Sequence, residues 1–168
     1  ALGSITDDDA AIVTISDISG NENDGVITVT ATLDAAVQGG FTVDVNTADG
    51  TAMTSDSDYT AVTSQTLTFA GTAGETQTFT VTPTADAILE SDEDLTVSMN
   101  NLVATSLPVT ITDIATVTIT NDDSATVTIA DIAGAENSGA IIVTATLDAA
   151  VQGGFTVDVN TADGTAMT

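Results

Sequence analysis

The sequence predicts an all-β protein of tandem immunoglobulin-like antiparallel β-sandwiches, with about seven strands per repeat. The first observation behind this is internal repetition, because residues 125–168 repeat residues 11–54 at an offset of 114, with 37 of 44 positions identical. The second is a set of short stretches that alternate apolar and polar residues and are separated by turn-forming residues. A period of this length fits a small independent domain and is too long for a solenoid repeat.

The repeat divides the chain into three parts. Residues 1–9 align with residues 115–123, so we expect them to be the tail of a preceding repeat. Residues 10–123 form one complete repeat. Residues 124–168 form the opening part of the next repeat and hold only its first three strands. The longest unbroken match joins residues 29–54 to residues 143–168.

Each predicted strand carries apolar residues at every second position, which would face a core while the residues between them face water. Ile27, Val29, Ala31 and Leu33, for example, alternate with polar residues that are mostly threonine. In chain order the predicted strands are residues 12–15, 26–33, 41–45, 59–62, 79–81, 95–99 and 117–119, and it stays open whether the fourth continues into residues 67–69. The phenylalanines are all expected at inward positions: Phe41, Phe69, Phe79 and Phe155.

The composition is one-sided in charge. The chain has 25 Asp and Glu residues but no Lys, Arg or His, so its net charge at pH 7 is −25. Nucleic acid and anionic membranes are not expected partners, because phosphate groups are bound through Lys and Arg. No apolar run approaches the ~20 residues that a membrane span requires. Since Cys and His are absent, only oxygen ligands remain for a metal, and these suit Ca²⁺.

Most of the carboxylates are predicted to gather at one end of the sandwich. If successive strands run antiparallel, the loops after the first, third and fifth strands share the end at which the last strand leaves. These loops and the exit linker carry 13 of the 17 acidic residues of the complete repeat: Asp17, Glu22, Asp24, Asp49, Asp56, Asp58, Asp86, Glu90, Asp92, Glu93, Asp94, Asp122 and Asp123. Two like charges 4 Å apart repel by about 1 kcal/mol even in bulk water.

A bound cation would remove this repulsion. Calcium accepts six to eight oxygen ligands in flexible geometry, whereas Mg²⁺ fits less well because it prefers a strict octahedron and keeps its waters. The alternative reading is that Asp is simply favoured in turns and that a negative surface keeps the protein soluble.

Several segments together resemble the Calx-beta domain family, and the resemblance covers the complete repeat and the partial copy. They are residues 47–52, 58–60, 67–69, 74–75, 90–93 and 121–123. Two positions depart from the family: Leu95 stands where an aromatic residue is usual, and Asn121 where a third linker Asp is common. The second departure would remove one metal ligand.

The resemblance implies an immunoglobulin-like sandwich with Ca²⁺ at the end where the linker to the next domain leaves. The implied ligands are Glu22, Asp49, Asp58, Asp86, Glu90, Asp92, Glu93, Asp122 and Asp123. Asp24 and Asp56 are weaker candidates, and Ser138 replaces Asp24 in the partial copy. Glu136 and Asp163 match Glu22 and Asp49.

These observations predict a calcium-stiffened stalk segment of a very large, secreted cell-surface adhesin of the bacterial type, with Ca²⁺ at the joints between neighbouring repeats. Near-identical repetition fits a part selected for length. The alternative is a calcium-sensing regulatory module, which would bind at micromolar calcium, whereas extracellular modules bind at about 10⁻⁴–10⁻³ M. No enzyme is expected, because the chain has no His, Cys or Lys to activate a nucleophile, and a carboxylate-pair glycosidase would want aromatic platforms at its surface.

Overall fold

The computed structural model describes residues 2–6, 8–104, 107–111 and 114–164. Asp113 and the last four residues of the predicted partial copy lie outside these ranges. The chain divides into two compact units: Ala1–Asp86 with Ser91–Asp122, and Ala87–Glu90 with Asp123–Thr168. The described residues include no helix with the length and hydropathy that crossing a bilayer demands.

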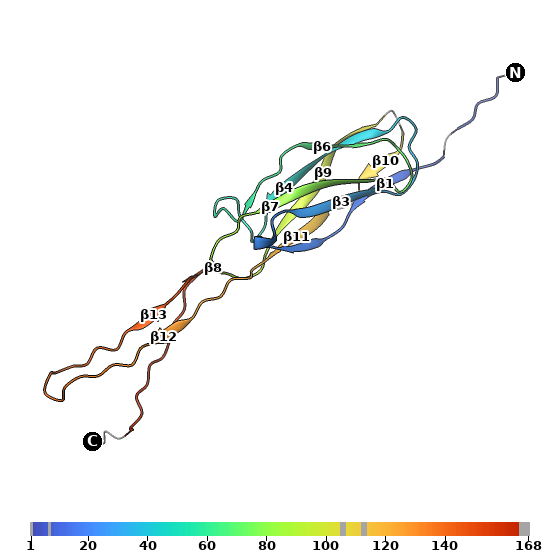
Figure 1. Cartoon of the computed structure of the whole chain (residues 1–168). Coiled ribbons are helices and arrows are strands. Elements are labelled where there is room, and N and C mark those ends of the chain that lie inside the picture. The colour runs from blue at the N-terminus through green and yellow to red at the C-terminus, as the bar shows by residue number, and fades with distance from the viewer. Residues whose placement is uncertain (1, 7, 105–106, 112–113, 165–168) are drawn as a thin grey trace. The chain divides into compact units, whose positions relative to one another are not determined.

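The first unit is a sandwich of two five-stranded sheets, with strand orders β10-β1-β3-β7-β5 and β2-β11-β9-β4-β6 (Figure 1). The strands are β1 (Ala11–Ile15), β2 (Ile18–Asn21), β3 (Ile27–Leu33), β4 (Phe41–Asp49), β5 (Tyr59–Thr60), β6 (Gln65–Phe69), β7 (Thr76–Pro83), β9 (Glu93–Ala104), β10 (Val109–Ile111) and β11 (Ile114–Thr120). The predicted all-β sandwich is confirmed. Most pairings are antiparallel, but β1 pairs with β10 and β2 with β11 in parallel.

The core lies between the two sheets and follows the predicted period of two. In β3, buried Ile27, Val29, Ala31 and Leu33 alternate with more exposed residues. Phe41 in β4 stacks on Phe69 in β6, with ring centroids 4.9 Å apart. Alternate inward side chains of both sheets therefore build a single apolar layer.

The first predicted strand is longer than expected and is divided between the two sheets. After β1 the chain crosses at Asp17, whose Oδ1 accepts a hydrogen bond from Thr116 N at 2.7 Å, and continues as β2 beside β11. Residues 20–25, which lie between the first two predicted strands, are therefore partly strand. The chain continues into the short 3₁₀-helix η1 (Glu22–Asp24), where the side chain of Asn21 accepts from Asn23 N at 2.8 Å.

The structure also settles the fourth strand, because β5 and β6 lie in different sheets. Between them Val62 leaves the strand and donates its N–H to Thr47 Oγ1 at 2.9 Å. Strand β10 was not predicted, since its three residues are too few to show a period.

In the second unit, β12 (Val127–Ile129) pairs antiparallel with β13 (Ala145–Leu147), and β14 (Ala150–Val151) pairs in parallel with β8 (Ile88–Leu89). Residues 155–159, the counterparts of residues 41–45 in β4, form no strand. Phe155 is 51% exposed, so the prediction that it faces inward is wrong. A strand face is buried only when a second sheet covers it, and the described residues of this unit form no such sheet.

Candidate functional site

The register of the second sheet brings four loops to one edge. Asn21 lies opposite Thr120, and the preceding residue of β11, Ile119, lies opposite Glu93 at the start of β9. On the other side of β9, Leu95 lies opposite Asp49 at the end of β4. The loops after β2, β4 and before β9, together with the exit from β11, therefore share one end of the first unit, which we call the acidic end.

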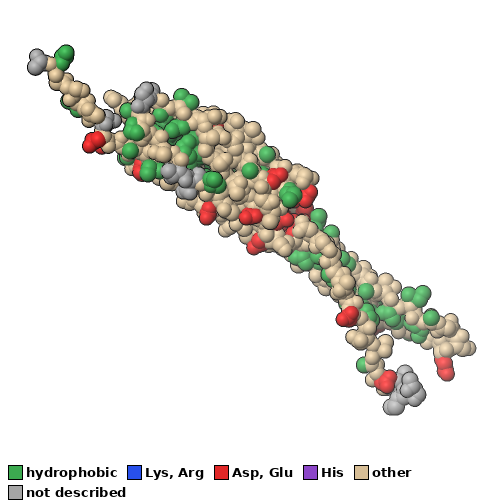
Figure 2. Space-filling view, turned by 180° about the vertical axis from the view of Figure 1, so that it is seen from behind, with side chains coloured by type: hydrophobic (Ala, Val, Ile, Leu, Met, Phe, Trp, Pro, Cys, Tyr) green, Lys and Arg blue, Asp and Glu red, His purple; other side chains and the backbone are tan. Residues whose placement is uncertain are grey.

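Carboxylates gather at the acidic end. On the face of the first unit visible in Figure 2, most of the red Asp and Glu side chains lie over the end that leads to residue 123, while green apolar side chains gather nearer the N-terminus. With no Lys, Arg or His in the chain, no side chain offsets this negative potential.

The first group of carboxylates consists of Glu22, Asp122 and Asp123, each of which offers an oxygen within 4.8 Å of the others. Glu22 is held by η1, whose entry is fixed by the Asn21 cap. Asn23, also in η1, donates from Nδ2 to Asp122 Oδ1 at 2.6 Å and so fastens the exit linker to this turn.

Glu22 is the only charged side chain that is buried among the described residues, with 6% of its surface exposed. A carboxylate withdrawn from water is costly unless a proton or a cation compensates it. The chain contains no basic side chain that could do so. The donor set of this group, which is made entirely of oxygen, therefore fits Ca²⁺.

The second group consists of half-buried Asp58, Glu90 and Glu93, whose carboxylate oxygens also lie within 4.8 Å of one another. Asp58 Oδ2 accepts from Met53 N at 2.7 Å, and the carbonyl oxygen of Asp58 accepts from Thr84 N at 2.9 Å. These bonds position the loop after β4 against the residues that follow β7. Hence this group also has the composition of an oxygen-ligand cation site.

The structure places three predicted ligands outside both groups. Asp49 is held by the Tyr59 hydroxyl, which donates to Asp49 Oδ1 at 2.6 Å. That bond holds the pKa of Asp49 below its usual value, with help from Thr54. Asp92 Oδ1 accepts from Asn121 N at 3.1 Å, and Asp86 is exposed. The weaker candidates Asp24 and Asp56 are exposed as well and belong to neither group.

Sequence reasoning did not give Asp94 a role, although this residue joins two loops of the acidic end. Its Oδ1 accepts from Thr51 Oγ1 at 2.7 Å and from Thr51 N at 3.2 Å, and its own N–H donates to Thr51 Oγ1 at 2.7 Å. The bonds from Thr51 lower the pKa of Asp94. A side chain at Gly50 would collide with the Asp94 carbonyl, so this contact requires glycine. The Gly50-Thr51 pair within residues 47–52 was therefore the sequence signal that could have indicated the role of Asp94.

The two departures from the family pattern have visible consequences. Leu95 is fully buried in the core, so an aliphatic side chain fills the position where the family usually has an aromatic one. Asn121 contributes its backbone N–H to Asp92.

Fold and acidic end together define an immunoglobulin-like β-sandwich with oxygen-only candidate metal groups at one end. The family model of the Calx-beta domain matches residues 6–131 and again residues 122–168. The chain belongs to the Calx-beta domain family, and the predicted resemblance is confirmed.

Solved structures agree on the fold. The crystal structure of the apo-form Calx CBD1 domain aligns with 68% of this chain and 100% of its own, with 23% identity and a TM-score of 0.58. The structure of CBD12 from CALX1.2 aligns with 67% of this chain and 44% of its own, with 23% identity and a TM-score of 0.57. The structure of calcium binding domain CBD12 of CALX1.1 aligns with 66% of this chain and 44% of its own, with 24% identity and a TM-score of 0.52. The comparison with curated protein sequences finds no match.

Proposed function

We propose that this chain is a calcium-stiffened stalk segment of a large, repetitive, secreted cell-surface adhesin, with Ca²⁺ at the joints between repeats. The observation that carries the proposal is the buried Glu22 carboxylate beside Asp122 and Asp123 in a chain without a basic side chain. Membership of the Calx-beta family supports it, because a solved structure with the same fold is titled a calcium binding domain.

The stiffening would follow from where the ligands lie in the chain. Glu22 belongs to the body of the repeat, whereas Asp122 and Asp123 belong to the segment that leaves it. An ion held by all three would restrict rotation at the exit, since each carboxylate would keep one position relative to the others. Backbone carbonyls or water would complete a coordination number of six to eight.

The second group would act on the loops. An ion between Asp58, Glu90 and Glu93 would hold the loop after β4 against the loop before β9, both already ordered by Asp94 and Thr51. We therefore expect calcium to order these loops and the exit together.

The stalk role rests on repetition. Residues 29–54 and 143–168 are identical, and a surface selected for one specific partner gains nothing from being copied without change. A secreted setting would supply calcium at the ~10⁻⁴–10⁻³ M that extracellular modules bind.

A calcium titration of this chain tests the proposal, with melting temperature and small-angle scattering followed against excess chelator and against Mg²⁺. We expect stabilisation and reduced flexibility with a midpoint near 10⁻⁴ M or weaker. A micromolar midpoint would favour the calcium-sensing alternative. An unchanged melting temperature at millimolar calcium would refute a metal site.

The matched variants are Glu22→Gln and Glu136→Gln, which change the same position of the repeat in the two copies. Of these two residues, only Glu22 lies in a group of carboxylates found among the described part of the chain. If both variants weakened calcium binding equally, the buried group would not be the site.

A further inference from the structure

A three-residue segment of the second unit is paired with the residues before β9. In β14, Ala150 lies opposite Ile88 and Val151 opposite Leu89, in parallel. Gln152 N donates to the Leu89 carbonyl at 3.0 Å, and Gln152 Nε2 donates to Glu90 Oε1 at 3.2 Å. Backbone and side chain thus both contribute to this docking.

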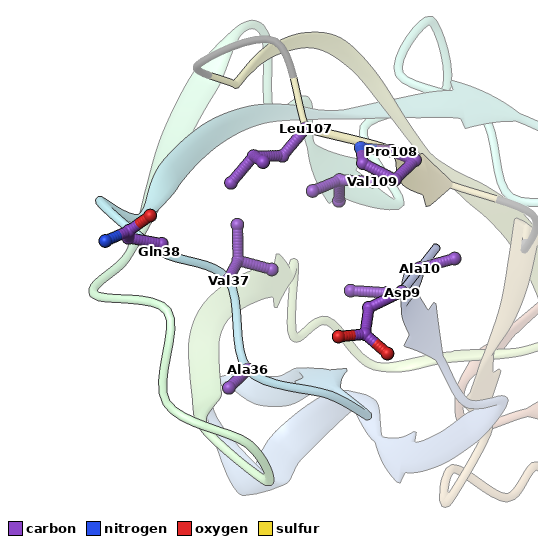
Figure 3. Close-up of a pocket in the computed structure, with 9 residues that line it drawn as sticks. Asp9, Ala10, Ala36, Val37, Gln38, Leu107, Pro108 and Val109 are labelled. Atoms are coloured by element: carbon purple, nitrogen blue, oxygen red, sulfur yellow. The ribbon is translucent and has the colours of Figure 1, made fainter. Parts of the chain in front are cut away.

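The same three residues occur in the first unit, where Ala36, Val37 and Gln38 stand 114 positions earlier. There they line a cavity of about 350 Å³ together with residues 9–11 and 107–109 (Figure 3). In that view Val37 and Leu107 face each other across the cavity while Gln38 points away from it. The first unit therefore presents this docking segment next to a cavity that has aliphatic side chains such as Val37 and Leu107 in its lining and also the Asp9 carboxylate.

The geometry points to residues 36–38 as a docking site for residues 88–90 of a second copy of the repeat. The incoming Ile-Leu-Glu segment adds a short parallel strand at residues 36–38, in the register that residues 150–152 show. In a tandem array the repeat before this one supplies the segment. Main-chain pairing gives the affinity, and the alternating side chains give the selectivity.

The backbone of the docking segment is compatible with this pairing. Val37 already donates its N–H to the Gly71 carbonyl and accepts from Gly40 N. The second of these bonds recurs as Gly154 N to the Val151 carbonyl, beside the pairing with β8. In a parallel ladder, Leu89 is bonded by the residues on either side of Val151 and not by Val151 itself. The turn from Gly154 to Val151 and the pairing with β8 therefore coexist in the second unit, and the corresponding turn and pairing can coexist in the first.

Side-chain parity assigns the incoming residues to their places. Partners in register lie on the same face of a sheet, so Leu89 takes the side of Val37 and enters the cavity towards Leu107. Glu90 takes the side of Gln38 and meets its amide, as Glu90 meets Gln152. The cavity thus accepts an aliphatic side chain next to a carboxylate.

Disulfide trapping tests the inference, because the chain has no cysteine of its own. One chain carries Ile88→Cys with Gln152→Pro, which removes the N–H that holds Leu89 and so releases the donor segment. An isotope-labelled second chain carries Ala36→Cys. The two are mixed under mild oxidation, in excess chelator and at high ionic strength, which screens the repulsion between acidic chains. We expect several-fold more mixed disulfide than with Ala61→Cys, an alanine elsewhere that is also exposed.

Two further variants make the test specific. Leu107→Asp in the second chain should abolish the excess by placing a charge in the cavity, whereas Val103→Asp, at an exposed position, should leave it unchanged. A single chain with Ile88→Cys and Ala150→Cys should form its internal disulfide whether or not Leu107 is changed. Mixed disulfide equal to the Ala61→Cys control, or indifferent to Leu107→Asp, would overturn the inference. Because trapping is done without calcium, either result leaves the calcium proposal to its own titration.

Discussion

The two copies of the repeat contain the same 26 residues, 29–54 and 143–168, in very different surroundings. Phe41 is 5% exposed and Phe155 is 51% exposed; Val45 is fully buried and Val159 is 63% exposed. In the first copy β7, β9 and β11 complete two sheets around these residues. Identical sequence therefore does not fix burial, which depends on strands far away in the chain.

Several local contacts, by contrast, recur in both copies. Asp34 Oδ1 accepts from Ile12 N at 2.6 Å, and Asp148 Oδ1 accepts from Thr126 N at the same distance. The pairing of Val13 with Leu33 recurs as Val127 with Leu147. The repeat thus encodes its first strand pair and turns locally, whereas its core needs the whole domain.

The largest effect should come from removing the same aromatic ring in each copy. Phe41→Ala removes a buried ring that stacks on Phe69 and should lower the free energy of unfolding by about 3–5 kcal/mol. Phe155→Ala should change it by less than about 0.5 kcal/mol. Urea unfolding followed by circular dichroism reports on both units, and the fluorescence of Tyr59, the only tyrosine, reports on the first. Equal costs would show that the second copy is packed in solution like the first.

The next effect sharpens the comparison at the acidic end. At calcium 100-fold above its dissociation constant, binding would stabilise the folded protein by about 2.7 kcal/mol. Glu22→Gln should lose most of this gain, yet in chelator it should raise the melting temperature, because it removes a buried charge. Glu136→Gln, at an exposed position, should do neither. A Glu22→Gln variant that is destabilised in both conditions would show that this carboxylate acts only as a structural acceptor.

A smaller effect should distinguish local from global stability. Asp34→Ala should lower the free energy of unfolding of the first unit by about 1 kcal/mol, since it removes one hydrogen bond at the start of β1. Asp148→Ala should leave that value unchanged but speed amide hydrogen exchange at Thr126. Unaltered exchange at Thr126 would mean that the strand pair of the second copy does not depend on this local bond.

The same division explains what could be predicted from the sequence. Strands such as β3 and β4 were predictable because alternation is written in consecutive residues, and strand parity placed the loops of the acidic end together. The division of the first strand into β1 and β2 was not, since it depends on Asp17 meeting Thr116, 99 positions away. Phe155 was wrongly predicted to face inward because the sequence around it is identical to that around Phe41. Only the strands that pack against the two residues differ.

Within the candidate site, the sequence could name carboxylates but could not sort them. The structure groups six of the nine predicted residues, while Asp49, Asp86 and Asp92 lie elsewhere. Which carboxylate stays outside the groups depends on contacts made only in the fold, such as the Tyr59 hydroxyl to Asp49 and the Asn121 N–H to Asp92, 29 positions away, and the order of residues does not show these contacts. Their assignment as ligands stays a prediction.

The smallest expected effect concerns Asp49, which accepts a hydrogen bond from the Tyr59 hydroxyl. Burial first, and then the hydrogen bond to Asp49, raise the pKa of Tyr59 to about 12 from 10.0. The stability that comes from this shift is fully present below pH 10 and is lost as the pH rises through 12. The lowered pKa of Asp49 acts at the other extreme, where its contribution disappears as the pH falls below 3.8.

Tyr59→Phe should therefore lower the free energy of unfolding by only about 0.5–1 kcal/mol at neutral pH, the worth of one hydrogen bond. The same variant should remove the loss of stability between pH 10 and 12. Because Tyr59 is the only tyrosine, its ultraviolet absorbance reports its ionisation directly, and in urea the transition should return to near pH 10. A transition near pH 10 in the folded wild type would show that Tyr59 does not hold Asp49.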